Sequence, residues 1–234
     1  MKRYLFIFAF AILAQSANAQ LFSKERVTNL ETFDKKLLTW GYFLGFNTYD
    51  FNFDYEQDLG PETDVVVNST GGFNVGLIGD LRINKYVNLR LEPGLYFTQR
   101  DLLYRQFEEE NDRLRSLQST YIHVPLLVKF STKRINNFKP FIVGGVSTSL
   151  NLSSNQDNPE DNGEGQFRMK KNTSYFELGF GIDFYLFYFK FTPSIRGVFA
   201  TSDELVRDEN PNSAYTSNIA KMGSRGLFVN FTFQ

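Results

Sequence analysis

The chain has 234 residues, no cysteine and a single histidine, with 25 basic and 26 acidic side chains. Its length fits one domain, and its near-neutral charge gives no basic surface for nucleic acid. The lack of cysteine excludes disulfides and cysteine-ligated zinc. Phenylalanine occurs 26 times, so the first question is which solvent these rings face.

The first nineteen residues have the pattern of a secretory signal peptide. Lys2 and Arg3 form a basic start, residues 4–14 an apolar run, and residues 17–19 the Ala-Asn-Ala that a signal peptidase reads. We predict Sec export with cleavage after Ala19, which leaves a net charge of about −3. The apolar run is too short for a membrane helix.

Residues 20–37 form the next predicted segment, which lies in the periplasm before the first strand. Its sequence from Leu21 to Leu37 allows a short helix with Leu30, Phe33 and Leu37 as the apolar stripe. We assign residues 38–234 to a single β domain.

Apolar residues alternate with a period of two from Leu38 onward, which indicates strands rather than helices. The stretch "YFELGFGIDFYLFYFKFTPSIRGVFA", residues 175–200, is the clearest example. Eight strands are predicted. Their apolar faces carry Trp40, Tyr42, Leu44, Phe46; Phe73, Val75, Leu77, Leu81; Val87, Leu89, Leu91, Leu95, Phe97; Ile122, Val124, Leu126, Val128, Phe130; Ile142, Val146, Leu150; Phe176, Leu178, Phe180, Ile182, Phe184; Phe187, Phe189, Phe191, Ile195, Phe199; and Leu227, Val229, Phe231, Phe233.

The predicted connections alternate between short and long. Short turns lie near residues 84–85, 131–137 and 185–186. Long polar loops cover residues 56–70, 101–118, 153–173 and 201–222. This alternation is typical of outer-membrane barrels. The fold class is therefore all-β: an eight-stranded antiparallel transmembrane β-barrel with short periplasmic turns and long extracellular loops.

The volume of the side chains decides which face points inward. An eight-stranded barrel has room inside only for packed side chains. The bulky apolar face does not fit there, whereas the opposite face is rich in small residues. Its glycines are Gly41, Gly45, Gly76, Gly94, Gly145, Gly179 and Gly181. We expect the apolar face to contact lipid.

Charged residues then point into the lumen, where buried ions need partners. We expect a structural salt-bridge network that fills the lumen; an open channel or a proton path is the alternative. The expected network comprises Asp80, Arg82, Arg90, Glu92, His123, Lys129, Glu177, Asp183, Lys190 and Arg196.

No residue pattern predicts catalysis, a cofactor or a metal site. His123 lies on the lumen face without a nucleophile in a recognisable motif, so we expect it to be hydrogen-bonded there. The loop "QDNPEDNGEGQ", residues 156–166, fails the calcium-loop spacing because Pro159 stands where a ligand is needed. Four prolines near predicted strands suggest bulges or strand ends. They are Pro93, Pro125, Pro140 and Pro193.

The stretches "YIHVPLLVKF" (121–130) and "FKPFIVGGVSTSL" (138–150), with the signal peptide and the Phe-rich final strands, resemble the PorT/SprT family of outer-membrane barrels in Bacteroidota. That family belongs to the type IX secretion and gliding-motility system. The resemblance implies a non-enzymatic protein needed to export cargo with a C-terminal signal. It implies outer-membrane lipid and other type IX components as partners, with no nucleic acid and no small-molecule substrate.

Three rival functions remain open from the residues alone. The first is a small porin-like or solute-binding outer-membrane barrel. The second is a soluble periplasmic lipid carrier with its apolar face inward, and the third is a membrane enzyme.

Overall fold

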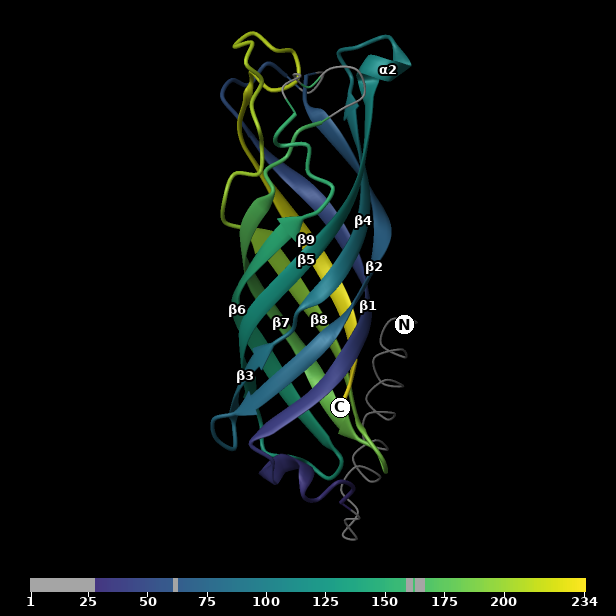
Figure 1. Ribbon diagram of the computed structural model, residues 1–234, viewed down its shortest axis with the longest axis vertical. Helices are drawn as coiled ribbons and strands as arrows, with labels where there is room; N and C mark the ends of the chain where they lie inside the picture. Colours follow the sequence, from purple (N-terminus) through teal and green to yellow (C-terminus); the bar gives the residue numbers. More distant parts are fainter. Residues whose placement is uncertain (1–27, 61–62, 159–161, 163–166) are drawn as a thin grey trace, which may run out of the picture.

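A computed structural model describes residues 28–60, 63–158, 162 and 167–234. The predicted signal peptide and residues 20–27 lie outside this part. The described strands form one antiparallel sheet that closes on itself, since β1 pairs with both β2 and β9 (Figure 1). The strands are β1 (Leu38–Tyr55), β2 (Val65–Arg82), β3 (Val87–Leu91), β4 (Gly94–Tyr104), β5 (Leu114–Ser131), β6 (Phe138–Asn151), β7 (Asn172–Tyr185), β8 (Lys190–Ala200) and β9 (Ile219–Phe233). Two short helices accompany them, η1 (Phe33–Lys35) and α2 (Glu110–Arg113).

β3 and β4 are two parts of one spanning strand. Both pair with β2 and with β5, and the register is the same on either side of the break. The break falls at Glu92 and Pro93, because proline has no N–H to donate to the ladder. The described residues thus form eight spanning strands, which confirms the predicted fold class.

Pro93 is a strand end, as predicted, but the other three prolines lie inside strands without a register shift. Instead, shifts occur between Asp54 and Tyr55 and between Thr70 and Phe73, near the long loops. The expectation of bulges at Pro125, Pro140 and Pro193 was therefore wrong.

Each of these prolines sits where a missing donor has little effect on the ladder. Glu92 N donates to the carbonyl of Pro125, so the absent return bond falls at the existing break between β3 and β4. Pro140 accepts from Thr132, which lies just beyond the end of β5. Pro193 lies where the β7–β8 ladder is interrupted.

The connections sort to opposite ends of the barrel, which we call the turn end and the loop end. Residues 83–86, 132–137 and 186–189 connect strands at the turn end. The long connections and α2 lie at the loop end, at the top of Figure 1. Strands extend further than predicted there, because β4 continues to Tyr104 and β5 begins at Leu114.

The described part of the segment before β1, residues 28–37, folds beneath the turn end and has only the single turn η1. Leu30 has a φ of 50°, which a continuing right-handed helix does not allow. Leu37 is 68% exposed, and Phe33 packs edge-on against Tyr185. The predicted helix with an apolar stripe was therefore wrong.

The outer face of the barrel is apolar, as the volume argument predicts. Trp40 is 68% exposed and Phe46 is 66% exposed. Large apolar side chains from every spanning strand are exposed in the same way. Soluble proteins rarely expose so large a continuous apolar surface, whereas a lipid-embedded barrel requires it.

The interior is not uniformly polar. Phe43, Phe141 and Phe228 point inward and are buried, so aromatic rings share the lumen with the glycines and charged residues expected there. Gly181 shows how a ring fits: a Cβ there would lie 2.5 Å from Cζ of Phe141. For Phe43 and Phe141 the space comes from a glycine on a neighbouring strand, Gly76 and Gly181 respectively.

Candidate functional site: the filled lumen and its two ends

The first layer of the lumen, nearest the turn end, is an ionic cluster around Phe141. Arg90 Nε lies 2.9 Å from an Asp80 carboxylate oxygen, and Lys129 Nζ lies 2.5 Å from Asp183. Both cations also lie over the Phe141 ring, at 5.2 and 4.1 Å from its centroid. Thus both buried cations have a carboxylate partner and an aromatic face.

The second layer of the lumen is a charge network centred on Arg196, and its members come from four strands. Arg196 Nη1 lies 2.8 Å from Glu92, and its Nε lies 2.8 Å from Glu177. Arg90 reaches Glu92 from the first layer, at 3.4 Å. His123 Nε2 lies 2.7 Å from Glu177. The layer therefore links β3, β5, β7 and β8 and the short break after β3 into one charge network.

His123, Ser149 and Glu177 have the residue types of a hydrolase triad. Ser149 Oγ lies 2.6 Å from His123 Nδ1, and Glu177 lies on the opposite ring nitrogen. A nucleophile must also reach a substrate. None of the three residues exposes more than 1% of its surface. The geometry is that of a satisfied internal hydrogen-bond chain.

The third layer consists of aromatic rings with one arginine above them. Tyr49, Tyr96, Tyr121, Tyr175 and Phe228 are buried together in one cluster. Arg100 donates to the Tyr121 hydroxyl at 2.7 Å. Aromatic rings therefore fill the barrel at this level.

Arg100 also contacts a polar pair that comes from the loop end. Its Nη1 donates to Ser224 Oγ at 2.9 Å, and Ser224 in turn donates to Glu204 through both its backbone N–H and its hydroxyl. Burial raises the pKa of the Glu204 carboxyl, while Arg100 and the Ser224 N–H act against that shift. Loop 201–218 is thus fastened into the top of the lumen.

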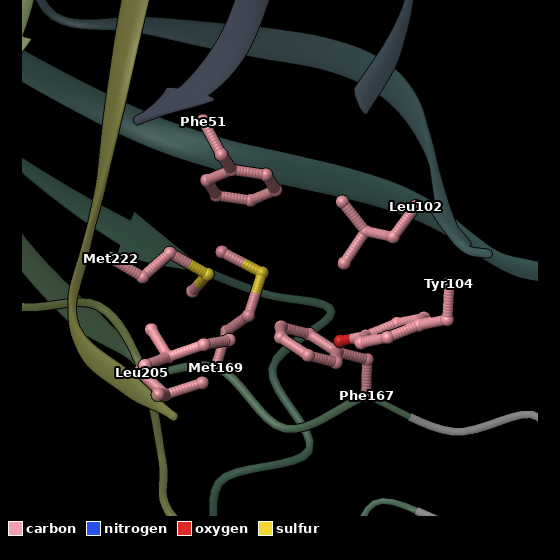
Figure 2. Packing of buried hydrophobic residues seen from close by; sticks show 8 residues of the cluster. Phe51, Leu102, Tyr104, Phe167, Met169, Leu205 and Met222 are labelled. Atoms are coloured by element: carbon pink, nitrogen blue, oxygen red, sulfur yellow. The ribbon is translucent and has the colours of Figure 1, made fainter. Parts of the chain in front are cut away.

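The fourth layer is an apolar core at the loop end. Figure 2 shows Phe51, Leu102 and Tyr104 from the strands beside Phe167 and Leu205 from the long loops. Met169, Ile219 and Met222 complete the buried cluster. At this level the inward side chains of the strands are apolar instead of charged, and they pack together like the core of a soluble protein.

These four layers fill the barrel with its own side chains. Ile78, His123, Tyr96, Arg100 and Leu102, which lie at successive levels, have no exposed surface. Solvent therefore does not reach the centre of the lumen from either end.

All ten charged residues singled out in the sequence lie on the inner wall. The structure places eight of them in the pairs above: Asp80, Arg90, Glu92, His123, Lys129, Glu177, Asp183 and Arg196. Arg82 and Lys190 instead line a cavity at the turn end.

Sequence reasoning missed the residues that close the loop end. Arg100, Arg115 and Glu204 are buried there, but the sequence analysis placed two of them in loops. Continuing the inward alternation from Tyr96 and Thr98 would have reached Arg100. Glu204 lies outside any strand, and nothing in its local sequence predicts its burial.

The turn-end cavity has a volume of about 290 Å³. Its wall combines the segment before β1, the turns at the turn end and inward side chains of the strands. The segment is held there by Arg134, which donates to the backbone carbonyls of Asn29 and Leu30, and by Asp34, which accepts from the Tyr185 hydroxyl at 2.6 Å. The cavity ends at the ionic first layer.

A closed antiparallel barrel with an apolar exterior and charged residues inside is typical of the class of outer-membrane barrel proteins. The sequence matches the family model "Outer membrane protein beta-barrel domain" over residues 14–206. The chain belongs to this family of outer-membrane β-barrel proteins. The turn end then faces the periplasm and the loop end faces the cell exterior.

Several solved structures are similar to the chain. OprG from Pseudomonas aeruginosa shares 14% identity over 83% of this chain and 94% of its own, with a TM-score of 0.49. Neisserial surface protein A shares 10% over 82% and 95%, with a TM-score of 0.41. Ail of Yersinia pestis shares 12% over 83% and 96%, with a TM-score of 0.37. No curated protein sequence matches the chain. At these identities no function is transferred.

In the part of the chain that the structure describes, none of the helices has the length and apolar character needed to cross a membrane. In the same part, no group of three or more His, Asp or Glu side chains is placed to hold a metal ion.

Proposed function

We propose that the chain is a non-enzymatic outer-membrane component of the type IX secretion system, required to export cargo with a C-terminal signal and gliding adhesins. The observation that supports action through protein contacts is the filled lumen, which leaves the two ends of the barrel as the accessible polar surfaces. The resemblance of residues 121–130 and 138–150 to the PorT/SprT family is the reason for proposing the type IX secretion system. These stretches lie in the neighbouring strands β5 and β6.

Deleting the gene tests the proposed role directly. Surface display of type IX cargo should be lost in the deletion strain, while unrelated outer-membrane barrels remain at their normal level. A plasmid copy should restore display. Normal cargo display in the deletion strain would reject the proposal.

The proposal includes Sec export and cleavage after Ala19. Mass spectrometry of the mature protein should find Gln20 at the N-terminus, in the outer-membrane fraction. Release of the protein by osmotic shock would instead support the periplasmic carrier.

A small porin-like or solute-binding barrel is the main rival, and it requires an aqueous path through the lumen. The purified protein in a planar bilayer should show no stable conductance, because buried side chains occupy every layer. A general porin measured under the same conditions serves as the control. Stable single-channel steps would favour the porin.

Crosslinking identifies the partners on the exterior side. A photoreactive residue in the connection 105–113 or 201–218 should capture type IX components. The same probe on the lipid-facing position Leu126 serves as the control for random collision. Capture from Leu126 alone would contradict a docking role for these loops.

A further inference from the structure

The periplasmic end of the barrel holds a cavity with a strong excess of positive charge. Nine basic and four acidic side chains line it among the described residues. The basic ones are Lys35, Lys36, Arg82, Lys85, Lys129, Lys133, Arg134, Lys139 and Lys190. This cavity takes no part in closing the lumen.

The four carboxylates of the cavity are already engaged. Asp80 and Asp183 pair with Arg90 and Lys129 of the first ionic layer. Asp34 lies 3.5 Å from Arg134 and 4.0 Å from Lys139. Glu31 accepts a hydrogen bond from Thr28. Asp183, Asp80 and Asp34 also attract the buried Lys190. Among the described residues, the only other cations of the cavity with which these acids form ion pairs are Lys129, Arg134 and Lys139.

Six cations form no ion pair of this kind. Within the described residues, no carboxylate oxygen lies within 4.0 Å of their side-chain nitrogens. They are Lys35, Lys36, Arg82, Lys85, Lys133 and Lys190. Lys190 is buried, and its Nζ lies 4.7 Å from the centroid of the Phe33 ring. Gathered around one hollow, these charges produce a positive potential that attracts an anion.

We propose that this cavity, which we call the basic mouth, binds an acidic segment of a periplasmic protein. The cations come from separate parts of the chain: η1 and its neighbour, two turns and two strands. Lysine ammonium groups spread over such a rim match several carboxylates along a peptide better than they match one small ion. The Phe33 ring adds an apolar surface between them.

The position of the basic mouth favours a soluble partner over a lipid. The strands separate it from the bilayer, and the segment of residues 28–37 lies across it. A lipid headgroup would have to leave the membrane plane to enter. The inference concerns this end of the barrel alone and does not depend on the type IX assignment.

Fluorescence anisotropy with a labelled peptide of alternating Glu and Ser tests the proposal, using the full-length mature protein in uncharged detergent. The peptide should bind, and a peptide with Gln in place of Glu should not. The variant Lys36→Gln/Lys85→Gln/Lys133→Gln should bind at least about tenfold more weakly, since charge pairs across an interface contribute strongly. All three lysines are exposed, so the fold should be retained.

A matched control removes the same charge from the other end of the barrel. Arg105→Gln/Arg113→Gln/Lys171→Gln replaces three exposed cations at the loop end and should bind the peptide like the unmodified protein. If both variants bound the peptide equally weakly, the loss of affinity would depend only on net charge, and the proposal would be overturned. Binding of the Gln peptide would also overturn it.

Competition experiments show whether the basic mouth prefers an acidic peptide, inorganic phosphate or an anionic lipid. At matched ionic strength, neither inorganic phosphate nor vesicles of anionic phospholipid should displace the acidic peptide more strongly than chloride or neutral vesicles. Preferential displacement by phosphate or by lipid would assign the basic mouth to that ligand and overturn the peptide proposal. Cargo export is not part of this readout, so its outcome is separate from that of the proposed function.

Discussion

The ring of Phe43 lies against Gly94, where an added Cβ would come within 2.8 Å of the ring carbon Cζ. Gly76, on the strand next to Phe43, is closer still to the same ring, since a Cβ there would lie 2.5 Å from Cζ. The glycines and the inward phenylalanine are thus one packing unit, in which missing side chains on two strands accommodate a ring from a third.

Gly94→Ala should therefore destabilise the barrel by about 1–3 kcal/mol, because the added methyl overpacks a site with no free space. The midpoint of urea unfolding in detergent measures the change. Gly71→Ala is the control, since a Cβ there meets nothing within 4 Å. Equal midpoints for Gly94→Ala and the unmodified protein would contradict the packing unit.

Glu177→Gln should cost about 3–5 kcal/mol, because it leaves the buried Arg196 and His123 without their shared carboxylate. Asp50→Asn breaks the exposed Asp50–Arg225 pair, which has a distance of 2.6 Å, and should cost less than about 1 kcal/mol. The same unfolding assay compares the two. A similar cost for both would show that solvent reaches the second layer.

Ser149→Ala distinguishes a structural histidine from a catalytic one. Removing the hydroxyl leaves one nitrogen of His123 unsatisfied, so stability should fall by about 1–3 kcal/mol. Cargo display should remain at the wild-type level when expression is matched. Loss of display with a fully folded barrel would favour the enzyme hypothesis.

The anchoring of loop 201–218 should weaken in acid. Partial burial of Asp203 opposes its ionisation, but the backbone N–H of Met222 and the Arg207 side chain hold its pKa below the usual value. A carboxyl whose folded pKa is lowered stabilises the fold above its unfolded pKa, near 4, and loses that contribution as the pH falls through the folded value.

Hydrogen exchange of residues 201–218, corrected for the intrinsic rate, measures this loss. Exchange should be faster at pH 3 than at pH 7 in the natural protein. In Asp203→Asn it should already be fast at pH 7 and should change little with acid. An acid-independent rate in the natural protein would exclude Asp203 as the anchor.

The wall of the barrel could be predicted from the sequence because alternation is a local property. The period of two separates the apolar face, with Trp40 and Phe46, from the face that carries Glu177 and Asp183, and the volume of the side chains decides that the apolar face points outward. The packing of the inward Phe43 against Gly76 and Gly94 could not be predicted, since only the strand register brings these glycines near the ring. Register is set by contacts distant in sequence.

The apolar core at the loop end could not be predicted, for a different reason. There, Phe51 and Leu102 continue the inward face, but the face changes from polar to apolar. That change reflects water outside the barrel instead of lipid, and the position of the membrane boundary is not encoded in any single residue. Likewise, the six cations of the basic mouth come together only because the turns converge.

The loop-end core of Figure 2 sets an order of events for biogenesis. Its members run from Phe51 in the first strand to Met222 in the last, so a chain that lacks the last strand does not contain them all. Such distant contacts carry a large ordering cost until the ends of the sheet have met. The exterior cap therefore consolidates last, and its resistance to protease reports that insertion has been completed.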